Sequence, residues 1–123
     1  MNSCSYDKVV LTTPQSAELA EIFKLLADPT RLRIVFACLD RAVAVGDIAA
    51  ELALSGSLVS HHLRLLRASR VVRAERQGKH VFYIASDDHI RSVLKQMAVH
   101  VGEPPEAEDV EEVDETVADA VRR

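Results

Sequence analysis

Two histidines and two acidic residues near the end of the chain have the types and spacing of metal ligands. Asp87 and His89 are two residues apart, and His100 and Glu103 follow after ten intervening residues. Imidazole nitrogens and carboxylate oxygens are the donors of tetrahedral zinc sites, with cobalt or nickel as competitors. On a helix, eleven residues are about three turns, so His89 and His100 share a face but lie roughly 16 Å apart. One chain therefore cannot close the site.

The geometry closes if two copies of this helix run antiparallel across a twofold axis. Asp87 and His89 of one chain then meet His100 and Glu103 of the other, which gives two equivalent sites in a homodimer. The alternative interpretation is structural: an aspartate that caps the helix, a solvated His89, and a His100 that interacts with the helix dipole. The matching faces favour the metal site. Glu103 precedes Pro104, which disfavours helical geometry, so a water in place of Glu103 stays open.

A second group of polar and basic side chains has the spacing of a surface that reads DNA. Ser57, Ser60, His61 and Arg64 lie on one side of a helix that Ser55 would cap. Such side chains pair with base edges or phosphates, and a helix N-terminus favours phosphate. The candidate DNA contacts are Ser57, Ser60, His61, Arg64, Arg67, Arg76 and Lys79, and Arg70 and Arg73 extend the same basic surface. A solvated basic face on a structural helix is the alternative.

Hydrophobic periodicity and capping residues indicate the elements that would position these side chains. The expected elements are helices over 14–26, 29–39 and 45–52, a fourth helix from Ser55, strands over 71–76 and 80–84, and a fifth helix from Ser86 or Asp87 to about Gly102. Asp28 would cap the second helix, and Leu58 would lie on or near the buried face of the fourth. A short helix, a tight turn and a second helix form a helix-turn-helix, and a hairpin directly after it is a wing. The sequence predicts an α+β, mostly helical fold: a winged helix-turn-helix with about five helices and one β-hairpin, in a symmetric homodimer.

Charge is unevenly distributed along the 123 residues. Residues 103–123 carry nine acidic and two basic residues, a net charge of −7, whereas the other 102 residues carry +3. Residues 54–86 hold six basic residues and one acidic one, which suits double-stranded DNA as a partner. We expect an N-terminal arm (1–13), a DNA-binding and dimerisation domain (14–103) and an acidic tail (104–123). The valine spacing of the tail leaves open an amphipathic helix or a disordered segment.

Other function classes find little support in the sequence. No run of about eighteen apolar residues and no secretory signal is present, so we expect a cytoplasmic protein without a membrane partner. Ser60 and His61 are adjacent on a helix and do not face each other, and no oxyanion or phosphate-binding loop accompanies them, so we expect no enzyme. A DNA-binding protein that senses an oxidant through Cys4 and Cys38 is the alternative, although Cys38 has the setting of a core residue.

Three segments resemble the ArsR/SmtB family of metal-sensing repressors over about residues 15–103. They are residues 26–34 (LADPTRLRI), residues 57–63 (SLVSHHL) and the hairpin segment 76–83 (RQGKHVFY), and the ligand pattern of the last helix is met at Asp87, His89, His100 and Glu103. The resemblance implies a homodimeric winged-helix repressor that binds its operator without metal and releases it on binding metal. It also implies that His100 is coupled by a hydrogen bond to backbone near His62.

One departure from the family pattern bears on the metal. Many relatives have one or two cysteines in the third helix, where this chain has Ala44, Val45, Gly46 and Asp47. The thiolate site that arsenite, cadmium or lead would need is therefore missing. The ligand set that remains favours zinc, with cobalt or nickel as alternatives.

Overall fold

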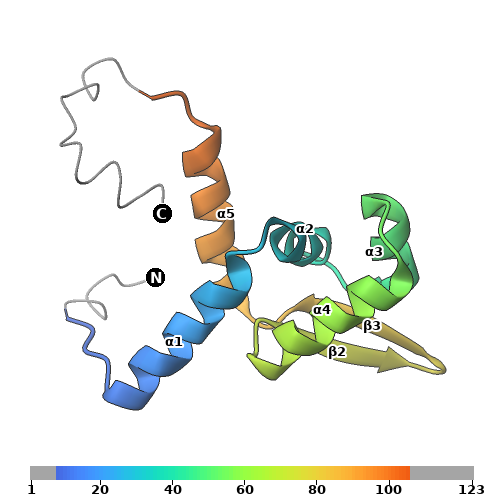
Figure 1. The fold of residues 1–123 in the computed structure, drawn as a ribbon, viewed down its shortest axis with the longest axis horizontal. Helices are drawn as coiled ribbons and strands as arrows, with labels where there is room; N and C mark the ends of the chain where they lie inside the picture. The colour runs from blue at the N-terminus through green and yellow to red at the C-terminus, as the bar shows by residue number, and fades with distance from the viewer. Residues whose placement is uncertain (1–7, 106–123) are drawn as a thin grey trace. The chain divides into compact units, whose positions relative to one another are not determined.

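The computed structural model describes residues 8–105 and contains five helices and a three-stranded antiparallel sheet in that range (Figure 1). The elements are α1 (Thr13–Leu26), α2 (Pro29–Ala37), β1 (Val43–Ala44), α3 (Val45–Leu52), α4 (Gly56–Ala68), β2 (Val72–Gln77), β3 (His80–Ala85) and α5 (Asp88–Gly102). The chain divides into two compact units, residues 1–92 and 93–123. Among the described residues, no helix is long and apolar enough to cross a membrane.

Side-chain caps begin four of the helices, and three of these caps match the prediction. Asp28, Ser55 and Asp87 each accept a hydrogen bond from a backbone N–H in the first turn of the helix that follows. Helix α1 begins one residue earlier than expected, because Thr12 and Gln15 form a reciprocal capping box. Helix α2 ends at Ala37, two residues before the predicted end.

The core of the first unit lies where α2, α3 and α4 pack with one another and with the sheet. Its largest fully buried side chains are Ile34, Val35, Cys38, Ile48, Val59, Leu63, Leu66, Val71 and Val72. These residues come from α2, α3, α4, β2 and the positions directly after α2 and before β2, so the inner face of α4 is fixed by apolar contacts on several sides. The outer face of α4 is thereby presented to solvent.

The short strand β1 is absent from the sequence-based prediction, which expected a hairpin alone. Val43 and Ala44 pair with Tyr83 and Phe82, so the strand order is β1–β3–β2. Two residues are too few to give a period-two pattern, which explains why the sequence does not reveal this strand. Since β1 leads directly into α3, it joins the hairpin to the helix-turn-helix.

The turn between α3 and α4 depends on a left-handed backbone residue that is not glycine. Ala53 has φ 57° and ψ 46°, and the N–H of Leu54 donates to the carbonyl of Ala49 at 2.9 Å. This is the usual way to end a helix, but glycine is the residue that adopts this conformation without steric cost.

We therefore expect Ala53→Gly to raise the free energy of unfolding by about 1 kcal/mol. Ala50→Gly is the matched control, because Ala50 lies within α3, where glycine is unfavourable and should destabilise the protein by about the same amount. Urea denaturation of the two variants checks the opposite signs. Destabilisation by both variants would contradict the prediction.

Candidate nucleic-acid interface and metal-binding residues

The outer face of α4 presents most of the side chains that the sequence predicts to contact DNA. Ser57, His61 and Arg64 are exposed and Ser60 is half-buried. Ser55 and Ser57 lie close together at the start of the helix, with their hydroxyl oxygens 3.4 Å apart. Hydroxyl, imidazole and guanidinium groups thus follow one another along a single exposed stripe, which offers both donors and acceptors to base edges.

Leu58 differs from the expectation that it lies on or near the buried face. Its side chain is 39% exposed, whereas Val59 beside it is fully buried. Leu58 is three residues before His61 and therefore belongs to the exposed stripe. An apolar side chain there suits contact with a thymine methyl group. Counting the helical spacing backwards from His61 would have revealed this residue in the sequence.

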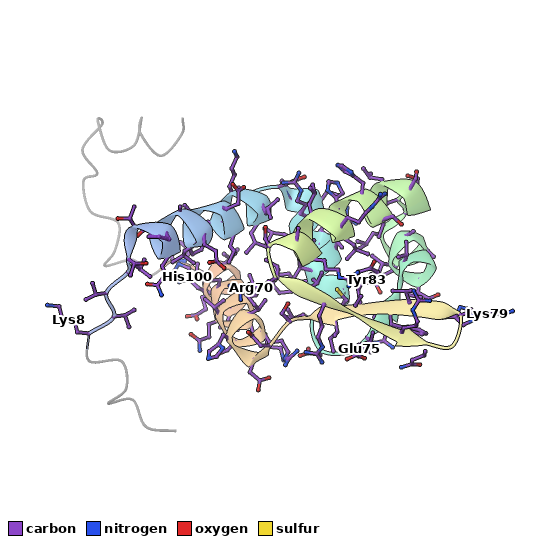
Figure 2. The ribbon with its side chains drawn as sticks, turned by 90° about the horizontal axis from the view of Figure 1, so that it is seen from below. Lys8, Arg70, Glu75, Lys79, Tyr83 and His100 are labelled. Carbon is purple, nitrogen blue, oxygen red and sulfur yellow. The ribbon has the colours of Figure 1, made fainter. Side chains whose placement is uncertain are left out.

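The basic side chains fall into two groups. Arg70 forms an ion pair with Glu18 of α1, which raises the pKa of the guanidinium, and Arg73 donates to the carbonyl of Ser86 at 2.7 Å and to Glu75 at 3.0 Å. Arg64, Arg67, Arg76 and Lys79 are exposed, and within residues 8–105 no carboxylate pairs with them. Lys79 lies at the tip of the hairpin (Figure 2). These four cations remain available for phosphate.

Asp87 and His89 are the half of the candidate metal site that lies in the first unit. Nδ1 of His89 is 3.7 Å from Oδ1 of Asp87, close to the roughly 3.4 Å that separates two ligands of one tetrahedral zinc ion. Both side chains are mainly exposed. Oδ1 of Asp87 also caps α5 by accepting from the N–H of Ile90. The structural interpretation of Asp87 as a cap is therefore correct, and the cap holds the carboxylate next to the imidazole.

Asp87 and His89 also line a groove of about 570 Å³ in the first unit. Glu18 and Ile22 of α1 form one wall, and Arg70 and Ile90 also line it. Within residues 8–105, no three His, Cys, Asp or Glu side chains lie close enough to hold a metal ion. Asp87 and His89 therefore offer two donors, and a four-coordinate ion needs further donors from elsewhere.

His100 and Glu103 belong to the second unit. His100 is in the last turn of α5. The N–H of Glu103 donates to the carbonyl of Val99 at 3.1 Å, so the helical hydrogen bonding continues to Glu103 although Pro104 follows. Helix α5 nevertheless ends at Gly102, so Glu103 lies just outside the helix, as the proline that follows it predicts.

The thiol of Cys38 is buried. Its side chain is fully buried, its Sγ contacts the carbonyl of Ile34 at 3.5 Å, and burial raises the pKa of the thiol to about 12. Oxidants react with exposed thiolates, so a buried neutral thiol is a poor sensor. The expectation of a core cysteine is confirmed. Cys4 and the acidic tail beyond residue 105 lie outside the described residues.

A helix-turn-helix followed by a hairpin, with exposed cations on both, defines a winged helix-turn-helix DNA-binding protein. A family model described as the bacterial regulatory protein, arsR family, matches residues 28–74. The chain is 39% identical over 94 residues to the transcriptional repressor SmtB homolog of Synechocystis, over 76% of this chain and 71% of that one. The chain therefore belongs to the ArsR/SmtB family of transcriptional regulators, which are DNA-binding proteins and not enzymes.

Two further relatives have names that refer to metals or metalloids. The chain is 32% identical over 84 residues to the CadC homolog of Staphylococcus aureus, a cadmium resistance transcriptional regulatory protein, over 68% of this chain and 69% of that one. The solved structure of the AntR antimony-specific transcriptional repressor has a TM-score of 0.65 and 27% identity, over 82% of this chain and 92% of that one.

Proposed function

We propose that this chain is a metal-responsive transcriptional repressor that binds operator DNA as a homodimer and releases it when zinc binds. Cobalt and nickel are the competing ions. The observation that carries the proposal is the Asp87–His89 pair, held by a helix cap at the spacing of tetrahedral ligands. The partner's His100 and Glu103 would complete each site, with a water as the substitute for Glu103.

Two apolar surfaces support the homodimer. Leu25 is the one residue of α1 that is buried, while Leu19 and Phe23 are exposed. In the second unit, α5 exposes Met97 and Val101, as well as Val93 and Val99. Helices with so little buried area gain stability when a second copy covers them. Residues 14–103 would then form the DNA-binding and dimerisation domain.

The DNA contacts that we propose divide into two kinds. Ser57, Ser60, His61 and Arg64 would read base edges with Leu58, and Arg67, Arg76 and Lys79 would bind phosphate. Two recognition helices in a symmetric dimer would meet two half-sites about one helical turn apart.

Mixed dimers of two variants test the shared metal site. His89→Ala and His100→Ala each remove a ligand from both sites of their own homodimer, so we expect neither homodimer to bind zinc tightly. In a mixed dimer, both substitutions fall in the same site and the other site is intact. Co-expression with two different affinity tags, followed by calorimetric zinc titration, should give two ions per unaltered dimer, one per mixed dimer and none per variant homodimer.

The arrangement of the control chains makes this test specific for ligands shared between chains. A mixed dimer of unaltered chain with a chain that carries both substitutions should have no intact site, because each site loses one ligand. Zinc binding by both kinds of mixed dimer, or by neither, would contradict the antiparallel arrangement.

A further inference from the structure

The inner face of the recognition helix α4 contains a histidine that accepts a hydrogen bond from an arginine. His62 is 7% exposed and is the one buried polar residue among those described. Nε of Arg31, in α2, donates to Nδ1 of His62 at 3.1 Å. Arg31 also donates to the carbonyl of Leu25 at 3.4 Å and lies 3.8 Å from the carboxylate of Asp28. Arg31 thus links the end of α1 and the start of α2 to α4.

This bond requires the neutral form of the histidine. Nδ1 accepts a hydrogen bond from the N–H of Arg31, so a neutral ring must carry its proton on Nε2. Arginine stays protonated at every pH at which proteins fold. A second proton on His62 would remove the acceptor and place an imidazolium beside a guanidinium. The bond is therefore lost, and replaced by repulsion, when His62 is protonated.

Burial lowers the pKa of His62, and the charge of Arg31 lowers it further. Asp28 opposes these effects by raising the pKa, and the neighbouring His61 lowers it. Helix α2 also carries Arg33, and helix α3 and strand β2, which pack against α4 as well, carry Asp47, Glu51, Arg73, Glu75 and Arg76. The largest charge effects on this pKa are those of Arg31, Asp28 and His61.

We propose that the Arg31–His62 hydrogen bond positions the recognition helix and that protonation of His62 makes operator binding fail on acidification. This inference rests on the proposed DNA-binding function and adds a pH response to it. The sign follows from linkage: the competent form of the protein binds fewer protons than the form in which the bond is broken. Its contribution is complete above about pH 6.5, the ordinary pKa of histidine, and declines as the pH falls below that value.

The exposed histidines of the DNA-binding surface have the opposite effect. His61 in α4 and His80 in the wing are exposed on the DNA-binding surface, where a positive charge would face phosphate and strengthen binding. A loss of affinity on acidification therefore points to His62 and not to these residues. For each His62 that must lose a proton before binding, affinity falls by up to about tenfold per pH unit below the pKa.

The test uses a duplex selected from random DNA with unaltered full-length protein at pH 8. Operator affinity is measured by fluorescence anisotropy from pH 8 to pH 5.5 at constant ionic strength. His62→Gln supplies an amide oxygen that accepts from Arg31 but does not titrate. We expect this variant to bind within about threefold of the unaltered protein at pH 8 and to lose most of the decline in affinity at low pH. His61→Gln is the matched control, and it should bind more weakly at every pH but keep the decline.

An NMR titration of the histidine rings in the unaltered protein makes the test independent of how well the variants fold. We expect the pKa of His62 to lie below the ordinary histidine value of about 6.5, and Arg31→Met to raise the pKa of His62 and weaken binding at pH 8. The inference is overturned if His62→Gln keeps the full acid decline, if His62 titrates at its ordinary value, or if circular dichroism shows global unfolding over the same pH range. Failure to select any duplex at pH 8 would instead refute the proposed function.

Discussion

Asp87→Ser is expected to bind the operator as tightly as the unaltered protein and to remain bound when zinc is added. A serine hydroxyl accepts the hydrogen bond from the N–H of Ile90 that the aspartate accepts now, so the start of α5 is kept. The carboxylate 3.7 Å from His89 is removed, and a four-coordinate site loses a ligand. One ligand typically changes the affinity for another by about 5- to 150-fold. We expect an effect of this size of zinc on operator affinity in the unaltered protein and none in Asp87→Ser.

The neighbouring aspartate provides a matched control for this substitution. Asp88 lies one residue further along and pairs with Arg91 at 2.7 Å, which lowers the pKa of Asp88. Asp88→Ser should therefore keep the zinc response, and His89→Ala should lose it as Asp87→Ser does. Anisotropy titrations of labelled operator with and without zinc measure all three. If zinc still made the Asp87→Ser variant release the operator, Asp87 would act only as a helix cap.

Arg64→Ala should weaken operator binding by about 10- to 100-fold, equally with and without metal. Arg64 is exposed on the stripe of α4 that carries His61, and no carboxylate within the described residues pairs with it. A guanidinium that contacts guanine or phosphate from this position contributes roughly 1–3 kcal/mol of binding free energy. The same titrations, repeated at several salt concentrations, distinguish the two contacts: loss of a phosphate contact lowers the salt dependence, whereas loss of a base contact relaxes sequence preference.

Arg41→Ala removes the same charge from the exposed loop between α2 and β1 and serves as the control. Arg41→Ala should reduce operator affinity much less than Arg64→Ala does, because Arg41 lies outside α4 and the hairpin. Equal losses for the two variants would mean that overall charge, and not the position of Arg64, accounts for the effect.

Local signals made most of the fold predictable. Asp28, Ser55 and Asp87 cap the helices that the sequence assigned to them, because a side chain that caps a helix acts within three residues. The wing was predictable from two β-rich runs with Gly78 between them. Strand β1 was not, since its two residues form a strand only by pairing with Phe82 and Tyr83, nearly forty residues away.

The candidate site was less predictable, because side-chain partners depend on tertiary contacts. Arg70 and Arg73 look equivalent to Arg64 in the sequence, yet Glu18 and Glu75 neutralise them. His62 looks like a second polar residue beside His61, although it faces inward toward Arg31, thirty-one residues away. The spacing of Asp87 and His89 was informative because both residues belong to one short segment.

The pairing of Val43 and Ala44 with β3 affects how a repressor of this kind would release its operator. Because β1 is hydrogen-bonded to β3 of the wing and continuous with α3, we expect the hairpin and the helix-turn-helix to move together. The wing and the recognition helix α4 would then act as one DNA-reading unit. In the proposed dimer, a metal that binds between the two copies of α5 would then act mainly by changing the separation and tilt between the two DNA-reading units, which must match the pitch of the double helix.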